Sequence, residues 1–278
     1  MKTRLECLPC LARQALESAR IATDDSEVQG RIVRTVLSKL SQAELDATPF
    51  ELGGMVQRTV RTLTGIGDPY LSIKQQSNRY ALQKYPEMKE LVASAEVPLA
   101  VATKIAITGN IIDFGVPDRL DIEEPLNRIM HTPFAVDDFD LFAERIAAAD
   151  RILYLGDNAG EIVFDRVLIE EFSASEVIVT VKDEPFINDA MMADAQAAGL
   201  DESVRILPIP IYPETTDEFE MAWSTADLII AKGQANYEAY SEVSGPLFYL
   251  LVAKCKAVAD ELGVSIGDLI LKANSSSL

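Results

Sequence analysis

Polar side chains that suit cation and phosphate chemistry follow three short apolar runs in the second half of the chain. In chain order they are Asp157 with Asn158, then Asp189, and then Lys232 with Asn236. Carboxylate and amide oxygens are ligands that Mg²⁺ or Mn²⁺ accepts, and a lysine ammonium suits a phosphate group. Because a divalent cation beside a phosphate-binding group serves metal-assisted phosphoryl transfer, the set predicts that chemistry.

Each of these residues also has a plain structural explanation. Asp157, Asn158 and Asp189 stand where a side chain often caps the N-terminus of a following helix. Lys232 could equally be a solvated charge at the end of a strand. The repetition after three successive runs favours chemistry, and both explanations stay open at this point.

The residues after about position 130 predict the sheet that would hold these side chains. Short β-type runs alternate with stretches of helical character, at 151–155, 160–172, 177–181, 188–198, 204–207, 216–223 and 227–231. Such alternation is typical of βαβ units and a mostly parallel sheet. One or two further strands are expected within 247–252 and 269–273, around a short helix at 256–262.

The ends of these strands are expected to face a common ligand. In an open α/β sheet, ligands bind beyond the carboxyl ends of the strands, which is where the polar residues fall. Gly156 and Gly160 allow a tight turn around Asp157 and Asn158. The free N–H groups at the start of the next helix are expected to face the same space and to suit an anion.

The first 130 residues predict helices instead. Apolar residues recur with helical spacing in five segments, at about 8–19, 32–40, 50–63, 69–85 and 97–112. The fourth helix is expected to end at Tyr85, because Pro86 follows it. The predicted class is therefore α/β: a helical N-terminal region (1–130) packed on a C-terminal core (131–278), which is a mostly parallel sheet with flanking helices.

Composition excludes several classes of function. The 278 residues are 48% hydrophobic, so the chain can bury a sizeable core and is expected to be globular. The 44 Asp and Glu outnumber the 25 Lys and Arg, and the net charge is −19. Residues 1–130 contribute −1 and residues 131–278 contribute −18. This acidity argues against nucleic acid or an anionic membrane as a partner, because both need a basic surface.

The compartment expected from the sequence is the cytoplasm. The N-terminus has no apolar segment of the signal-peptide type, and the longest strongly apolar run is far too short to span a bilayer. Three cysteines are a small, odd number for a secreted domain. Nothing in the sequence indicates an oligomeric state.

Six strings of the sequence resemble the metal-dependent damage-control phosphatases, a family long known only as a domain of unknown function, which includes the acidic-residue methyltransferase-like proteins. The second half contributes GDNAGEIVFD (156–165), FINDA (186–190) and KGQANYE (232–238). The first half contributes CLPC (7–10), DPYLSIKQQSN (68–78) and TGNIID (108–113), as in the short prokaryotic branch. The resemblance spans nearly the whole chain, and DNAGE followed by KGQ is its most specific feature.

The resemblance implies hydrolysis of small phosphate monoesters, such as sugar phosphates or damaged phosphometabolites, with Mn²⁺, Mg²⁺, Co²⁺ or Ni²⁺. The family's metal ligands, an Asp-Asn pair and a later Asp, correspond to Asp157, Asn158 and Asp189. Its phosphate-binding lysine corresponds to Lys232, and Asp157, Asp189 and Lys232 would be the catalytic residues. The attacking group would be water activated by the cation or a carboxylate, for which Asp157 is the first candidate.

The same resemblance implies a set of substrate-binding residues: Asn110, Asp113, Glu161, Gly233, Gln234 and Asn236. Asn110 and Asp113 would reach the substrate from the helical region. One position departs from the family pattern, since Ala235 stands where a glycine usually follows KGQ. The implied partner is a small phosphorylated metabolite.

Other functions have partial support. Cys7 and Cys10, at i and i+3, would share one helical face and could bind a metal or act as a redox pair in a non-enzymatic protein. No second Cys or His pair completes a zinc site, and packing as small apolar residues explains both cysteines more simply. A dinucleotide-binding oxidoreductase lacks its G-x-G-x-x-G loop here, and a carboxyl methyltransferase lacks a glycine-rich nucleoside loop.

Overall fold

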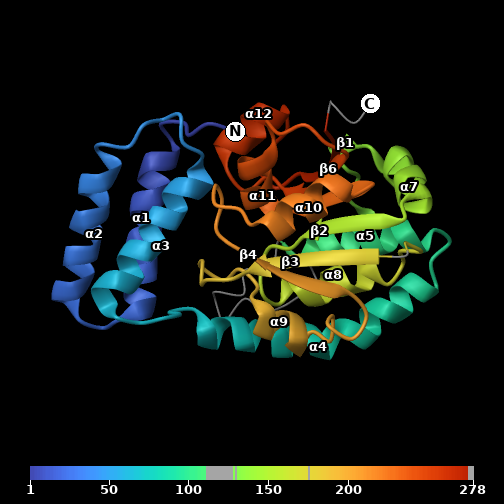
Figure 1. Cartoon of the computed structure of the whole chain (residues 1–278), viewed down its shortest axis with the longest axis horizontal. Helices are drawn as coiled ribbons and strands as arrows, with labels where there is room; N and C mark the ends of the chain where they lie inside the picture. Colours follow the sequence, from blue (N-terminus) through green and yellow to red (C-terminus); the bar gives the residue numbers. More distant parts are fainter. Residues whose placement is uncertain (111–127, 129, 175, 275–278) are drawn as a thin grey trace.

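The computed structural model describes residues 1–110, 128, 130–174 and 176–274. Within these residues seven strands form one sheet with helices on both faces, and three helices stand at one end of it (Figure 1). The predicted α/β class and the mostly parallel sheet are confirmed. Among the described helices, none combines the length and the apolar character that crossing a membrane requires.

The order of the strands creates a switch point in the sheet. The strands are β1 (Val136–Asp137), β2 (Arg151–Leu155), β3 (Glu176–Lys182), β4 (Arg205–Ile209), β5 (Leu228–Lys232), β6 (Leu247–Val252) and β7 (Leu269–Ala273). They lie in the order β1-β7-β6-β5-β2-β3-β4, and only the β6–β7 pair is antiparallel among the described strands. The chain runs outward from β2 to β3 and β4, and then returns to β5 on the other side of β2. Open α/β sheets bind ligands at such a reversal.

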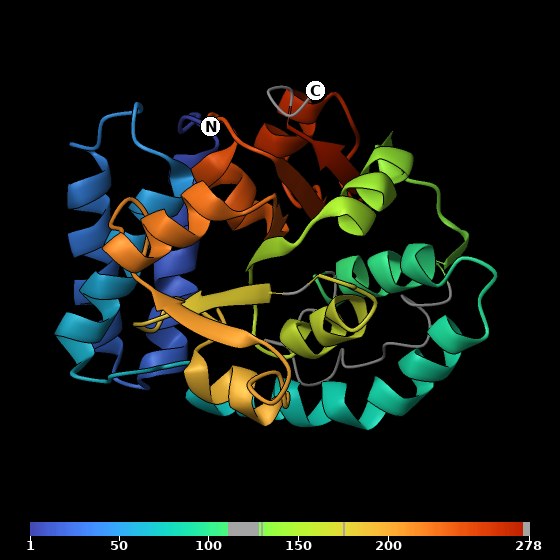
Figure 2. The ribbon, with the colours of Figure 1, turned by 45° about the vertical axis from the view of Figure 1, so that its right-hand side comes forward.

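Side chains that alternate along the strands form two apolar layers. In β2, Ile152 and Tyr154 belong to one layer, whereas Leu153 and Leu155 belong to the other. The first layer is covered by α4 (Leu71–Ala93), α5 (Pro98–Gly109), α7 (Phe139–Ala148), α8 (Glu161–Ile169) and α9 (Met192–Ala197). The second is covered by α10 (Asp217–Thr225), α11 (Gly233–Tyr240) and α12 (Lys256–Leu262). Figure 2 shows the teal, yellow-green and gold helices of the first layer and the orange and red helices of the second.

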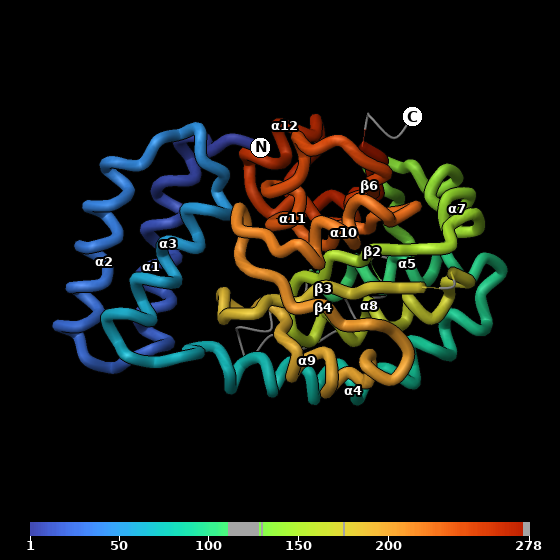
Figure 3. The backbone as a smooth tube through the Cα atoms, in the orientation of Figure 1, coloured from blue at the N-terminus to red at the C-terminus, as the bar shows by residue number. Residues whose placement is uncertain are grey.

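The helices before residue 110 fall into two groups. The first group is a bundle of α1 (Cys7–Ala22), α2 (Ser26–Leu40) and α3 (Pro49–Thr64), seen at the left of Figure 3. Its own apolar cluster includes Ala15, Val36 and Val56. Helices α4 and α5 form the second group and cover the sheet. The division of the chain at residue 130 stays a prediction.

The helix that contains Pro86 is longer than predicted. The prediction ended it at Tyr85, but α4 continues past the proline to Ala93. Ala81 and Met88, on either side of Pro86, are both fully buried in the first apolar layer. Packing along this face outweighs the one backbone hydrogen bond that a proline removes.

The prediction of helical character over 188–198 is wrong at its start, because the segment around Asp189 is not helical. The helix begins only at Met192, because the residues before it form two isolated bridges: Asp189 pairs with Asn158 in the turn after β2, and Met191 pairs with Lys182 at the end of β3. The prediction also missed β1, α7 and α11. Helix α11 begins directly after β5, with no loop between them to mark the change of structure.

Candidate functional site

The loop after β2 makes a tight turn at the carboxyl edge of the sheet. A Cβ atom at Gly156 would lie 2.7 Å from the backbone oxygen of Thr180 on β3. Gly160 has a φ of +77°, in the region that favours glycine. These two glycines allow the turn that holds Asp157 and Asn158, as the sequence predicts.

The loop that carries Asp189 is hydrogen-bonded to this turn. The N–H of Ala190 donates to the backbone oxygen of Asp157 at 2.8 Å. Asn158 and Asp189 are paired as an antiparallel bridge. The structure therefore brings the three predicted metal ligands together, although they come from two different loops.

Asn110 joins the site from the C-terminal end of α5. Its Nδ2 donates to Asp157 Oδ2 at 2.8 Å and to Glu161 Oε2 at 3.1 Å. Asn158 Nδ2 donates to the same two oxygens, at 2.9 Å each. Both N–H groups of the Asn158 amide are used in this way, so Oδ1 is the atom left for a cation. Asp113, predicted near the substrate, lies outside the described residues.

Lys232 is fully buried, and its ammonium group is saturated with acceptors. Its Nζ donates to the backbone oxygen of Ala106 at 2.9 Å, to Glu161 Oε1 at 2.7 Å and to Asp165 Oδ1 at 2.5 Å. An ammonium group has three N–H donors, so none is left for another ligand. The expected contact with a phosphate therefore lacks a donor in this arrangement.

Asp165 is part of the site, although the sequence analysis did not single it out. It lies four residues after Glu161 on α8, and both side chains are fully buried against Lys232. The hydroxyl of Tyr154 also donates to Asp165 Oδ1, at 2.8 Å. Two acids at i and i+4 in an apolar helix are a signal that could have found it, because buried acids require a buried cation.

Gly233 lies directly against Asp157. Its φ is +74°, and a Cβ atom there would lie 1.8 Å from Asp157 Oδ2 and 2.9 Å from Asn110 Nδ2. Only glycine fits between these groups. Gly233 thus packs closely against a predicted metal ligand, and its contact with substrate stays a prediction.

Asn236 and Gln234 of α11 face different surroundings. Asn236 Nδ2 lies within 3.3 Å of the backbone oxygens of Leu155, Gly156 and Lys232, and so joins the ends of β2 and β5. Gln234 lines the cavity described below. Of the two, Gln234 is therefore the one placed for contact with a ligand.

Two of the N–H groups that lead into α8, those of Ala159 and Gly160, are already used within the protein. The N–H of Ala159 donates to the backbone oxygen of Asn188 at 2.8 Å. The N–H of Gly160 donates to Asn78 Oδ1 at 2.7 Å. These contacts hold the turn in place, and an anion at the site would need donors other than these two.

Burial dominates the electrostatics of the site. It raises the pKa of Asp157 to about 6, and the neighbouring Glu161 adds to this shift. Burial also raises the pKa of Asp165 to about 7 and that of Asp189 well above its usual range. Burial acts in the same direction on Glu161, but Lys232, Lys254 and a hydrogen bond from Asn158 together outweigh it, and the pKa of Glu161 is lowered. At Asp157, Asp165 and Asp189 the nearby positive charge does not offset burial, so their pKa values stay raised.

A divalent cation fits this balance of charges. The buried carboxylates are Asp157, Glu161, Asp165 and Asp189, and the buried ammonium groups paired with them are Lys182 and Lys232. When all four carboxyl groups are ionised, two negative charges are therefore in excess. Of the four buried side-chain atoms without a hydrogen-bond partner in the described part of the chain, three belong to this site: Asn110 Oδ1, Asp165 Oδ2 and Asp189 Oδ2. A cation would satisfy such oxygens.

The set is not a preformed cluster of acidic ligands. In the described residues, no three His, Cys, Asp or Glu side chains are grouped closely enough to hold a metal ion. The predicted ligands are two carboxylates and one amide, and the amide of Asn158 is not one of those four residue types. Asp157, Asn158 and Asp189 as metal ligands therefore stay a prediction.

A cavity of about 630 Å³ opens beside the predicted ligands. Asp157, Asn158 and Asp189 line it, together with the exposed Lys254. Lys254 forms no ion pair with any other residue that the structure describes. Its ammonium group is therefore available to a ligand in the cavity, whereas that of Lys232 is not.

All three cysteines line the same cavity as free thiols. Cys7 is buried, Cys10 is exposed and Cys255 is partly exposed. Burial raises the pKa of Cys7, which disfavours the thiolate that metal binding and disulfide exchange require. Packing therefore accounts for Cys7, and a metal or redox role for the pair stays a prediction.

The chain is similar to known proteins over nearly its whole length. The family profile of the damage-control phosphatase ARMT1-like domain matches residues 3–270. Damage-control phosphatase PH1575 of Pyrococcus horikoshii is 35% identical over 100% of both chains. A damage-control phosphatase of Archaeoglobus fulgidus is 33% identical over 98% of this chain and 99% of that one. The crystal structure of the DUF89 family protein PH1575 has a TM-score of 0.91 at 33% identity and covers 99% of this chain and 100% of its own.

Gly233→Ala should weaken cation binding, because its new methyl group would overlap with Asp157. We expect the affinity for Mn²⁺, measured by calorimetric titration, to fall at least about tenfold. Gly263→Ala is the matched control, since Gly263 has a φ of +70° and no atom within 4 Å of its Cβ position. Both variants then bear a left-handed strain of about 1–2 kcal/mol. Equal Mn²⁺ affinities in the two variants would contradict the placement of Asp157.

Asp165→Asn should change how stability depends on pH in the metal-free protein. The pKa of Asp165 is about 7 in the folded chain and near 3.8 when unfolded, so folding takes up a proton between these values. This group therefore destabilises the folded state as the pH rises through that range, by at most about 1.4 kcal/mol per pH unit. The unfolding free energy of the variant minus that of the wild type should therefore increase from pH 4 to 7 and stay constant above about pH 8. Urea unfolding measures this, and a constant difference would contradict the raised pKa.

Proposed function

Because the chain belongs to the damage-control phosphatase ARMT1-like family, we propose that its cavity hydrolyses small phosphate monoesters with the help of a divalent cation. Family membership makes the chain a phosphatase. The proposal concerns the finer points, namely the substrate class, the cation and the residues involved. As substrates we propose sugar phosphates or damaged phosphometabolites, in line with the resemblance found in the sequence.

One observation carries the assignment of the cation to Asp157, Asn158 and Asp189. The loops after β2 and β3 are hydrogen-bonded to each other, so all three side chains share one cavity wall. The buried Asp189 Oδ2 has no hydrogen-bond partner among the described residues. When bound, the cation would polarise the phosphate group and lower the pKa of a water molecule beside it.

Hydrogen bonds orient the proposed ligands. Asp157 Oδ2 accepts from the amides of Asn110 and Asn158, which leaves Asp157 Oδ1 for the cation. Glu161 Oε2 accepts from the same two amides and so fixes Asn158 with its oxygen free. We therefore assign Glu161 to positioning the ligands, in place of the substrate contact predicted from the sequence.

Water is the attacking group that this arrangement favours over a carboxylate. Asp157 has one oxygen in hydrogen bonds and the other assigned to the cation, so neither is left for attack on phosphorus. Glu238 is the proposed proton acceptor, because it lines the same cavity and Gln234 Nε2 donates to it at 2.8 Å. Burial raises the pKa of Glu238 to about 7, which suits proton uptake near neutral pH.

Lys254 is the residue that we assign to the phosphate group. The sequence predicted Lys232 for this role, but the three donors of Lys232 are used by Ala106, Glu161 and Asp165. Lys254 is exposed to the cavity and without an ion pair among the described residues. A free ammonium group can form a charge-assisted hydrogen bond to a phosphate oxygen.

Asp157→Ala and Asp189→Ala should each lose phosphatase activity, because the cation loses a carboxylate ligand. We expect phosphate release from simple monoesters with Mn²⁺ to fall at least about 100-fold in both variants. Asp183→Ala is the control, since Asp183 follows the same strand as Asp189 but is exposed. Unchanged circular dichroism would show that the variants fold. Full activity in both would refute the assigned site.

Lys254→Ala should weaken the capture of substrate. A charge-assisted hydrogen bond contributes about 1.5–3 kcal/mol, so kcat/KM should fall about 10- to 100-fold. Lys256→Ala is the matched control, because Lys256 lines the same cavity but is paired with Asp260 at 2.7 Å. Steady-state kinetics on one monoester compares the two variants, and an equal loss in both would exclude a specific contact of Lys254 with phosphate.

A further inference from the structure

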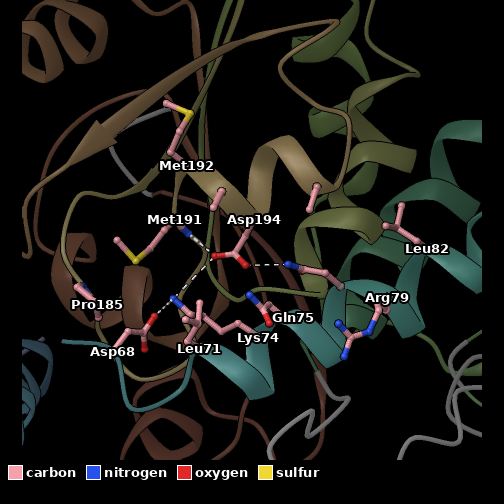
Figure 4. Close-up of a pocket in the computed structure, with 13 residues that line it drawn as sticks. Asp68, Leu71, Lys74, Gln75, Arg79, Leu82, Pro185, Met191, Met192 and Asp194 are labelled. Atoms are coloured by element: carbon pink, nitrogen blue, oxygen red, sulfur yellow. Dashed lines mark hydrogen bonds and ion pairs between the residues drawn. The ribbon is translucent and has the colours of Figure 1, made fainter. Parts of the chain in front are cut away.

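A second polar network lies on the buried face of α4. Lys74 and Asn78 of α4 are 1% and 4% exposed, and Asp194 of α9 is 5% exposed. Figure 4 shows Asp194 between Lys74 and the backbone of Met191. These residues line a different cavity, of about 640 Å³, and the chemistry proposed above does not use them.

Asn78 uses both ends of its amide to join two elements. Its Oδ1 accepts the N–H of Gly160 at 2.7 Å, in the turn that carries Asp157 and Asn158. Its Nδ2 donates to Asp194 Oδ1, also at 2.7 Å. Asn78 therefore links the turn after β2 to the start of α9.

Asp194 continues this link to the second loop. Its Oδ2 accepts the N–H of Met191 at 2.9 Å, two residues after Asp189. The ammonium group of Lys74 lies 3.9 Å from the same oxygen and 2.5 Å from Asp68. The charge of Asp194 is thus balanced inside the protein, as a buried carboxylate requires.

We propose that Asn78 and Asp194 are positioning residues that hold the two ligand-bearing loops at the spacing required for cation binding. One hydrogen-bonded chain runs from Gly160 through Asn78 and Asp194 to Met191, and it ends on both loops. Outer hydrogen-bond partners of a metal site typically change metal affinity about 10- to 100-fold. The proposal rests on the proposed function, because it presupposes the assigned cation site.

The first test compares Asn78→Ala with Ser77→Ala. Ser77 is the buried neighbour on the same helix, and its hydroxyl donates within α4, to the backbone oxygen of Ile73. The Mn²⁺ concentration for half-maximal phosphatase activity should rise at least about tenfold in Asn78→Ala and less than about twofold in Ser77→Ala. Calorimetric titration of the metal-free proteins should give the same ratio. Equal shifts in both variants would overturn the proposal.

The second test uses the double variant Asn78→Asp with Asp194→Asn, in which the amide and the carboxylate change places. In the double variant the carboxylate at position 78 can accept from the N–H of Gly160 and from the amide at position 194. The oxygen of that amide can accept from the N–H of Met191. All three hydrogen bonds and the net charge are kept, so Mn²⁺ dependence should return to within about threefold of the wild type, whereas each single variant should not recover. A folded double variant with Mn²⁺ dependence as weak as that of Asn78→Ala would overturn the proposal.

The same measurements separate this role from the proposed function. If the wild type needs Mn²⁺ and Asp157→Ala does not respond to it, the cation site stands, and an unchanged Asn78→Ala would refute only the positioning role. If Asp157→Ala responds to Mn²⁺ like the wild type, the assigned site itself fails, and the positioning role fails with it.

Discussion

The rest of the site depends on the hydrogen bonds and ion pairs of the buried Lys232 ammonium group. It lies at the end of β5 and binds acceptors on two helices, Ala106 of α5 and Glu161 with Asp165 of α8. Removing one partner from a buried ion pair typically costs about 3–5 kcal/mol, so these helices are strongly held against the sheet edge. Because Lys232 fixes one oxygen of Glu161, the other oxygen can orient the amide of Asn158. The lysine thus acts on the cavity through its partners, without facing it.

The position of the site follows from the order of the strands. The chain leaves β2 toward β3 and returns to β5 on the opposite side, so the segments after β2 and β5 diverge from one point at the sheet edge. Asp157 lies in the turn after β2 and Gly233 is the first residue of α11, and they are so close that a side chain at 233 would overlap with the carboxylate. Asn236 then joins the two strand ends through their backbone oxygens. The topology brings the segments together, and the glycine allows them to touch.

The sequence predicted most of the elements and the sheet edge at which the polar residues gather, but not which groups pair. The apolar runs before Asp157, Asp189 and Lys232 predict strands, and their polar ends predict one common edge. The partners of Lys232 come from segments far from it in the chain, and no local pattern distinguishes a saturated lysine from a free one. Pro86 shows the same limit in a helix, because burial of the face around it, which depends on the tertiary fold, outweighs its local effect.

The distribution of charge sets a condition on substrate binding. Residues 131–278 carry a net charge of −18, and a phosphate monoester, with a charge of about −2 near neutral pH, is repelled by such a surface. Of the basic residues that line this cavity, Arg13 is paired with Glu17 and Lys256 with Asp260, so in the described part of the chain only Lys254 adds an unpaired positive charge to the wall that holds Asp157 and Asp189. A bound divalent cation would reverse the sign locally. We infer that the cation controls the capture of substrate as well as its hydrolysis, and that the two affinities are linked: by reciprocity, a bound phosphate ester tightens the cation by the same factor as the cation tightens the ester.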